Sequence, residues 1–204
     1  MTSLHTPEQV LEILRMGNER WIAHEMIHPH RNPSRREITA LLGQKPMAAI
    51  LTCSDSRVEP VVLFDQGLGD LFVVRVAGNI AGPDVLGSLA FAVFELEVPL
   101  VLVLGHTACG AITAAMGGEV PEGAIRTLVE KLRPLAAQIR EEHPGEEVPE
   151  VINRAVYANV HQVLGDILEH SPVIRTAWEE GRVRLAGAVY DLKSGHVDWF
   201  MDEV

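Results

Sequence analysis

Three short segments in the middle of the chain are apolar at almost every position: residues 46–53 (PMAAILTC), 70–78 (DLFVVRVAG) and 99–106 (PLVLVLGH). Each is far shorter than the about 20 apolar residues that cross a bilayer. Strands that are apolar on both faces are typical of a parallel sheet covered by helices on both sides. The segments therefore predict buried parallel strands, and they limit the fold class more than any other feature.

Segments with helical spacing of apolar residues lie around these strands. We expect helices over 5–23, 34–43, 82–97 and 108–118, with Thr6 and Ser34 as N-caps of the first two, and a helical region over about 122–180 that breaks near 143–149 and 170–172. Residues 182–200 predict a strand, a turn and a last strand. The expected fold is α/β, with a mainly parallel central sheet flanked by helices and a C-terminal strand pair.

The length of 204 residues suits a single domain. We expect this domain to span 1–204, with an N-terminal helical arm over 1–43 and an α/β core over 44–204.

The two cysteines of the chain both follow predicted strands. Cys53 ends the first strand and is followed closely by Asp55 and Arg57, and Cys109 comes three residues after His106, which ends the third. Ligand sites of parallel sheets lie just beyond the carboxyl ends of the strands. We therefore expect the two thiols to share one crevice.

Two thiolates and one imidazole favour zinc over magnesium or calcium. Such a set leaves a fourth tetrahedral position, which either water or Asp55 could fill. Arg57 could pair with Asp55 through two parallel hydrogen bonds and hold the carboxylate away from the metal. The carboxylate could then accept a hydrogen bond from a zinc-bound hydroxide.

Each of these features has a plainer explanation on its own. A single cysteine at a strand end is usually a small buried hydrophobe, and an Asp-x-Arg pair usually lies on the surface. The combination favours a metal site over redox or nucleophilic thiols and over a structural role, and the residues alone leave these three explanations open.

The segments CSDSRVEP (53–60) and GHTACGA (105–111) closely resemble the zinc motifs of the β-class carbonic anhydrases. The segments GNERW (17–21), GDLFVVRVAGN (69–79) and GSLAFAV (87–93) are also similar to that family. The resemblance covers most of residues 7–120 in detail, and the C-terminal part is similar in pattern.

The resemblance implies that Cys53, His106 and Cys109 bind one Zn²⁺ per chain. Asp55 and Arg57 would be a catalytic pair that opens or closes the fourth zinc position, with Asp55 as the fourth ligand of the closed form. The implied reaction is the reversible hydration of carbon dioxide to bicarbonate and a proton by attack of zinc-bound hydroxide. Because the active cleft of the family lies at a subunit interface, the resemblance also implies a homodimer or a tetramer.

Four positions match substrate-pocket residues of the plant-type members. Gln44 matches a glutamine that reaches the substrate from across the interface, and Phe72 and Ala77 match apolar wall positions. Phe91 stands where those members have tyrosine, so it keeps the ring and lacks the hydroxyl. Some bacterial members bind an inhibitory bicarbonate with a tryptophan at the position of Ile50, and we expect that inhibitory site to be absent here.

Charge and composition argue against other classes of protein. The formal net charge of -11 disfavours a nucleic-acid partner, which requires a cationic surface. The first twenty residues lack a basic segment followed by an apolar one, so we expect no signal peptide, no membrane contact and a cytoplasmic location.

Alternative functions remain at this point. Hydrolysis of carbonyl sulfide or carbon disulfide is performed on the same scaffold by close relatives of the family, and pocket shape decides between those substrates and carbon dioxide. A non-catalytic zinc-binding protein would not need the Asp55–Arg57 pair. A thiol oxidoreductase is disfavoured because the chain has no Cys-x-x-Cys motif.

Overall fold

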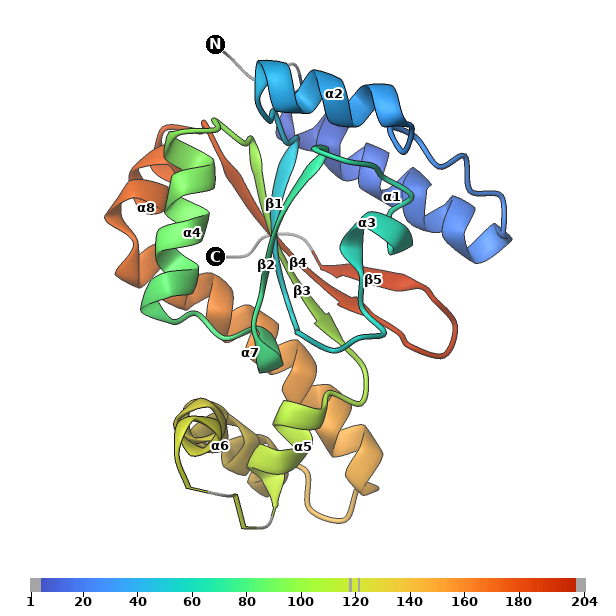
Figure 1. Ribbon diagram of the computed structural model, residues 1–204. Helices are drawn as coiled ribbons and strands as arrows, with labels where there is room; N and C mark the ends of the chain where they lie inside the picture. The colour runs from blue at the N-terminus through green and yellow to red at the C-terminus, as the bar shows by residue number, and fades with distance from the viewer. Residues whose placement is uncertain (1–4, 118, 121, 201–204) are drawn as a thin grey trace.

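The computed structural model describes residues 5–200 except 118 and 121, and a five-stranded sheet lies at its centre (Figure 1). The strand order is β2-β1-β3-β4-β5, with parallel pairing from β2 through β4 and antiparallel pairing of β4 with β5. The strands are β1 (Ala48–Thr52), β2 (Leu71–Arg75), β3 (Leu100–His106), β4 (Arg184–Tyr190) and β5 (Val197–Phe200). The predicted mainly parallel α/β sheet and its C-terminal strand pair are confirmed.

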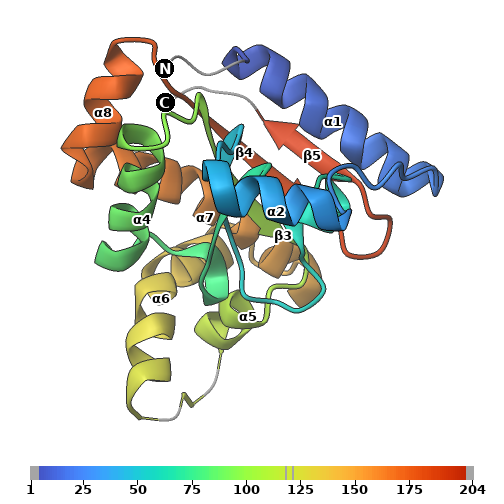
Figure 2. The ribbon, with the colours of Figure 1, turned by 45° about the horizontal axis from the view of Figure 1, so that its top comes forward.

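Helices cover both faces of this sheet. They are α1 (Pro7–Ala23), α2 (Pro33–Leu42), α3 (Pro60–Leu63), α4 (Pro83–Phe94), α5 (Gly110–Met116), α6 (Ala124–Glu142), α7 (Val148–His170) and α8 (Pro172–Glu179), with a short 3-10 turn η1 (Ala77–Asn79). Helices α1 and α3 lie on one face, and α4, α7 and α8 lie on the other (Figures 1 and 2). Helices α5 and α6 lie next to α7, towards the carboxyl ends of the parallel strands.

The sheet separates two hydrophobic cores. Ala49 and Leu51 of β1 pack into the core of α4 to α8, whereas Ala48 and Ile50 pack into the core of α1 and α3. This alternation follows from the two-residue period of a strand. Every residue of β1 and β3 is buried, as predicted for strands covered on both faces, whereas the edge strand β2 is half-exposed throughout.

The start of α2 differs from the prediction. Its N-cap is Asn32, whose side chain accepts a hydrogen bond from the Arg35 amide, and Ser34 lies inside the first turn. Pro33 supplies the reason, because proline suits the first helical position and the cap then immediately precedes it. The cap at Thr6 is confirmed, with a reciprocal capping box to Gln9.

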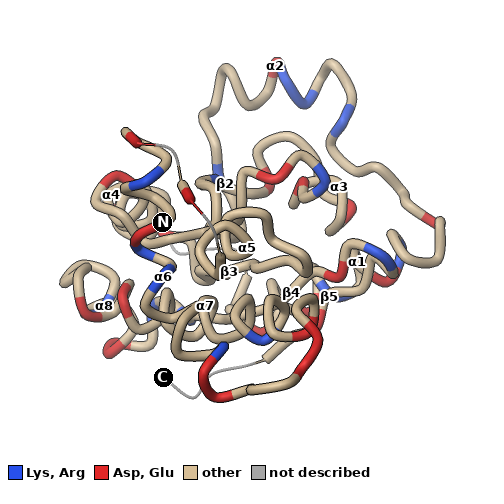
Figure 3. Tube along the Cα trace, turned by 90° about the horizontal axis from the view of Figure 1, so that it is seen from below, with Lys and Arg blue, Asp and Glu red and all other residues tan. Residues whose placement is uncertain are grey.

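Helices α1 and α2 occupy the segment expected to form an arm, and α2 has no buried residue. The division into arm and core stays a prediction. Acidic and basic residues are interspersed over the helices and loops (Figure 3). Within the described part of the chain, no helix combines the length and the apolar character that a membrane crossing requires.

Candidate metal centre

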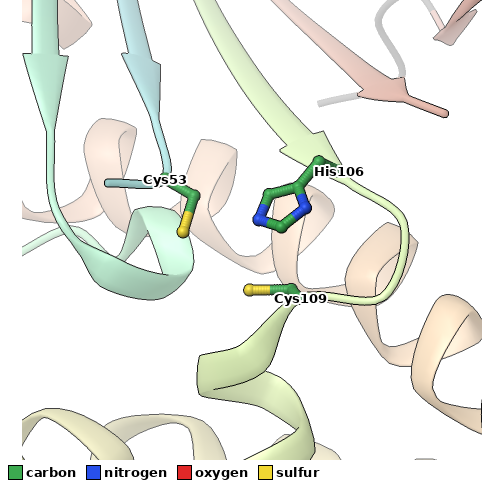
Figure 4. Close-up of side chains that lie close together, drawn as sticks. All are labelled: Cys53, His106 and Cys109. Carbon is green, nitrogen blue, oxygen red and sulfur yellow. The ribbon is translucent and has the colours of Figure 1, made fainter. Parts of the chain in front are cut away.

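The structure brings the three predicted metal ligands together (Figure 4). Cys53 follows β1, His106 ends the neighbouring strand β3, and Cys109 is the N-cap of α5. Their ligand atoms all lie within 4.8 Å of one another, and all three residues are buried. Two sequence-distant motifs therefore meet at the carboxyl edge of the sheet because β1 and β3 are adjacent.

His106 presents one ring nitrogen to this cluster. Its Nδ1 lies 3.0 Å from the backbone oxygen of Thr107, and because a carbonyl only accepts, Nδ1 carries the proton. Nε2 thus keeps its lone pair; it is buried and has no hydrogen-bond partner among the described residues. The contact of 3.9 Å from Nε2 to Asp55 Oδ2 is too long for a hydrogen bond.

The two thiols influence each other strongly. A hydrogen bond from the Cys109 thiol and another from the Gly78 amide, 3.3 Å from Sγ, lower the pKa of Cys53. The adjacent Cys53 sulfur and burial raise the pKa of Cys109. The pair therefore carries one negative charge readily, and a bound cation would favour the second. Two sulfurs, an unpartnered imidazole nitrogen and this electrostatic environment fit a zinc ion.

Asp55 lies beside the three ligands and pairs with Arg57. Its Oδ1 accepts hydrogen bonds from Arg57 Nε at 2.9 Å and from the Arg57 amide at 3.0 Å, and its Oδ2 accepts one from Nη2 at 2.7 Å. These contacts hold the pKa of Asp55 well below its usual range and raise the pKa of Arg57. The carboxylate is thus ionised and directed to the guanidinium rather than to the ligand group.

Arg75 holds the loop that carries Cys53 and Asp55, and sequence reasoning missed it. Its Nε donates to the Cys53 carbonyl at 3.3 Å, its Nη2 to the Asp55 carbonyl at 2.7 Å, and its Nη1 to Glu59 at 2.8 Å. The available signal was its place at the end of β2, where it pairs in register with Thr52.

Of the four predicted pocket residues, not all lie beside the Cys53–His106–Cys109 cluster of their own chain. Ala77 is in η1, next to the Gly78 amide that contacts Cys53. Phe72 and Phe91 contact each other, with ring centroids 6.3 Å apart, and Phe91 is 47% exposed. Phe72 is the second residue of β2, and Gln44 is exposed before β1.

Comparison with known sequences gives a consistent result. A family model described as carbonic anhydrase matches residues 48–197. Carbonic anhydrase 2 of Mycobacterium tuberculosis is 38% identical over 193 residues, which cover 93% of this chain and 90% of that protein. The carbonic anhydrase of Pseudomonas aeruginosa is 36% identical over 178 residues, which cover 81% of this chain and 79% of that protein.

Comparison with solved structures extends the similarity over nearly the whole chain. A structure from a study of two tetrameric β-carbonic anhydrases of Sordaria macrospora superposes with a TM-score of 0.76 at 26% identity, covering 94% of this chain and 96% of that chain. The Coccomyxa β-carbonic anhydrase in complex with acetazolamide gives a TM-score of 0.75 at 25% identity, with coverages of 95% and 85%.

Proposed function

This chain belongs to the β-class carbonic anhydrases, and we propose that it catalyses the zinc-dependent, reversible hydration of carbon dioxide to bicarbonate and a proton. The observation that carries this proposal is the buried Cys53, His106 and Cys109 cluster with the ionised Asp55–Arg57 pair beside it. A purely structural zinc site is closed by four protein ligands and does not need such a pair.

Each residue of the site has a separate role in the proposed reaction. Cys53, His106 and Cys109 would hold one zinc ion, which acts as a Lewis acid that makes water a nucleophile near neutral pH. Arg57 holds Asp55 ionised, so that the carboxylate acts as a hydrogen-bond acceptor at all working pH values. Asp55 Oδ2 faces His106 Nε2 at 3.9 Å, where it can orient the hydroxyl group that attacks carbon dioxide.

We also propose that Asp55 becomes the fourth ligand in a closed form of the site. In the described arrangement both carboxylate oxygens accept hydrogen bonds from Arg57, so closure requires the carboxylate to leave the guanidinium.

The fully buried Ile50 gives no polar group at the position that some family members use for inhibitory bicarbonate.

We propose further that the working enzyme is a homodimer or a tetramer in which each chain completes the pocket of its neighbour. The exposed positions of Gln44 and Phe91, together with the contact of Phe91 with the half-buried Phe72, support this arrangement. The Sordaria proteins of similar fold are described as tetrameric. A cytoplasmic location stays a prediction from the sequence.

Stopped-flow measurement of carbon dioxide hydration, with zinc content determined on the same sample, tests the proposal. We expect about one zinc per chain and rapid hydration. Zinc without hydration would overturn the proposed reaction, and hydrolysis of carbonyl sulfide and carbon disulfide would then be assayed on that sample. Zinc with none of these activities would instead indicate a non-catalytic zinc protein.

A further inference from the structure

Asn159 is a buried polar residue in the middle of α7, on the helix face that packs against the sheet. It is 2% exposed, and its helix neighbours Val156, Val160 and Val163 belong to the hydrophobic core. Its Nδ2 donates to the backbone oxygen of Gly78 at 3.0 Å. An amide in such surroundings is costly without a hydrogen bond, so this contact ties α7 to the η1 turn.

The η1 turn connects Asn159 to the metal centre. The amide of Gly78 donates to the Cys53 sulfur at 3.3 Å, so the same residue accepts from Asn159 and donates to a ligand. Gly78 has a φ of +74°, and a Cβ at this position would lie 2.7 Å from Leu132 Cδ1. The turn is therefore packed closely against α6, and Asn159 fixes the direction of the Gly78 carbonyl. The Nδ2 atom of Asn79, in the same turn, is also buried and has no partner among the described residues.

Helix α7 also contacts the segment between His106 and Cys109. Asn153 Oδ1 accepts a hydrogen bond from the Ala108 amide at 3.0 Å. Ala108 lies between His106 and Cys109 and has a φ of 54°, in the left-handed region that non-glycine residues seldom adopt. Helix α7 thus contacts the η1 turn, which donates to the Cys53 sulfur, and the segment that carries Cys109, although it contributes no ligand itself.

We propose that Asn159 is a positioning residue of the metal centre, which acts through the Gly78 carbonyl to hold the Gly78 N–H on the Cys53 sulfur. This inference rests on the zinc binding of the proposed function. An N–H···S hydrogen bond withdraws charge from a thiolate and fixes the direction of its lone pairs. Without this hydrogen bond the direction of the Cys53 sulfur is no longer fixed, which weakens metal binding. The thiolate also keeps more charge, which displaces the electronic transition from sulfur to the metal.

The test compares Asn159→Leu and Asn159→Ser with the native protein. Zinc affinity is measured by competition with a chromophoric chelator, and the thiolate-to-metal charge-transfer band is recorded for the cobalt-loaded proteins. We expect a loss of zinc affinity of about 10- to 100-fold and a displaced band in both variants, as is typical when a residue behind a ligand is removed.

Asn18 provides a matched control on the opposite face of the sheet. It is also a buried asparagine, 3% exposed, and its side chain bonds the backbone of Leu63, Gly195 and Val197. We expect Asn18→Ser to lower the unfolding temperature while zinc affinity and the cobalt band stay native. Asn159 variants that behave like Asn18→Ser would show a merely structural role and overturn the proposal.

A measurement on the native protein covers the case in which the variants do not fold. In protein loaded with an NMR-active cadmium isotope, the Gly78 amide proton should show scalar coupling to the metal through the Cys53 sulfur. Absence of this coupling would overturn the inference. A native protein that binds no metal would overturn the proposed function as well, whereas native binding with unchanged Asn159 variants would overturn this inference alone.

Discussion

Asp55 comes two residues after Cys53, and both of its carboxylate oxygens accept hydrogen bonds from Arg57. The Asp55 side chain is 16% exposed and that of Arg57 is 59% exposed, so the guanidinium reaches solvent while the carboxylate is largely covered. An ion pair at this degree of exposure contributes little to stability. Its position beside the ligands points to orientation of the reacting group rather than to folding.

We therefore expect Asp55→Ala to keep its zinc but to lose about 100-fold or more in turnover, the usual range for a group that handles a proton in the transition state. Metal analysis and stopped-flow hydration on one sample measure both quantities. Glu146→Ala is the matched control, because Glu146 forms a similar ion pair with Arg154, with Nε and Oε2 2.7 Å apart. This pair is not part of the ligand group. Full activity of Asp55→Ala would remove Asp55 from the mechanism.

The sequence predicts the ligands much better than their supports. Cys53, His106 and Cys109 are recognisable because their chemistry is rare and their spacing follows the strand ends. Arg75 and Asn159 act through backbone carbonyls of distant segments, and an arginine in a strand or an asparagine in a helix has no local pattern that marks such a contact. These contacts depend on which segments the fold places side by side.

At the scale of elements, α1 packs very closely on the segment after α3. A Cβ added at Gly17 would lie 1.8 Å from the backbone oxygen of Phe64. Helix propensity favours alanine over glycine by about 1 kcal/mol, but a backbone oxygen cannot move aside as a flexible side chain can. The close approach therefore decides whether a substitution at Gly17 raises or lowers the free energy of unfolding.

We expect Gly17→Ala to lower the free energy of unfolding by about 1–3 kcal/mol through overpacking. Gly165→Ala in α7 should instead raise it by about 0.4–1 kcal/mol, because nothing lies within 4 Å of its Cβ position. Urea denaturation of the two variants measures both changes. Equal effects of the two substitutions would contradict the close contact between α1 and Phe64.

The connection from α1 to α2 is fixed by a buried carboxylate. Asp65 is fully buried and accepts hydrogen bonds from Arg20 Nε at 2.7 Å, the Ile27 amide at 2.9 Å and the His28 amide at 3.0 Å. Burial alone would raise the pKa of Asp65, but these donors outweigh it and the pKa is lowered. The resulting stability is present above the ordinary aspartate pKa of about 4 and is lost as the pH falls through the lowered value.

Asp65→Asn should accordingly cost about 3 kcal/mol at neutral pH, because it removes one partner of a buried charge pair. The difference from the native protein should shrink below about pH 4, where Asp65 becomes protonated in the unfolded chain, and should vanish as the pH falls through the lowered pKa of the folded protein. Asp166 is a control of opposite sign, because burial raises its pKa, so Asp166→Asn should not destabilise the protein at neutral pH. Urea unfolding of the metal-free proteins across this pH range tests both expectations. If the loss of unfolding free energy in Asp65→Asn does not change with pH, the lowered pKa of Asp65 is contradicted.

The elements themselves follow from the sequence to different degrees. The strands β1 and β3 are uniformly apolar and were predicted directly, and the breaks between α6, α7 and α8 coincide with proline-containing segments. The four-residue α3 and the three-residue η1 were not predicted, because neither is long enough to show a hydrophobic period. Yet η1 supplies the amide that contacts Cys53, so the shortest element matters directly to the site.

At the scale of the whole molecule, α2 leaves a large apolar surface uncovered. Leu41 is 83% exposed and Leu42 is 72% exposed, and they lie three and two residues before the exposed Gln44. Large exposed apolar side chains that lie together mark contact surfaces. A partner chain seated here would bring its own Gln44 and Phe72–Phe91 pair with it.

The double variant Leu41→Glu/Leu42→Glu should therefore dissociate the proposed oligomer and lower the hydration rate together with it, since burial of unpaired charges at such a contact is costly. Light scattering coupled to size-exclusion chromatography measures the assembly, and stopped-flow hydration measures activity. Ile125→Glu on α6 serves as a control at another exposed apolar residue, 51% exposed. A fully active monomer would show that each chain holds a complete site.

The two asparagines of α7 also bear on the order in which the site is made during synthesis. The chain emerges from the ribosome amino end first. Once residue 109 has been added it contains every proposed metal ligand, but Asn153 and Asn159 follow only after more than forty further residues. The nascent chain therefore carries both thiols and the imidazole before it contains the helix that fixes their loops. Metal captured at that stage would bind to ligands whose final geometry depends on a segment not yet made.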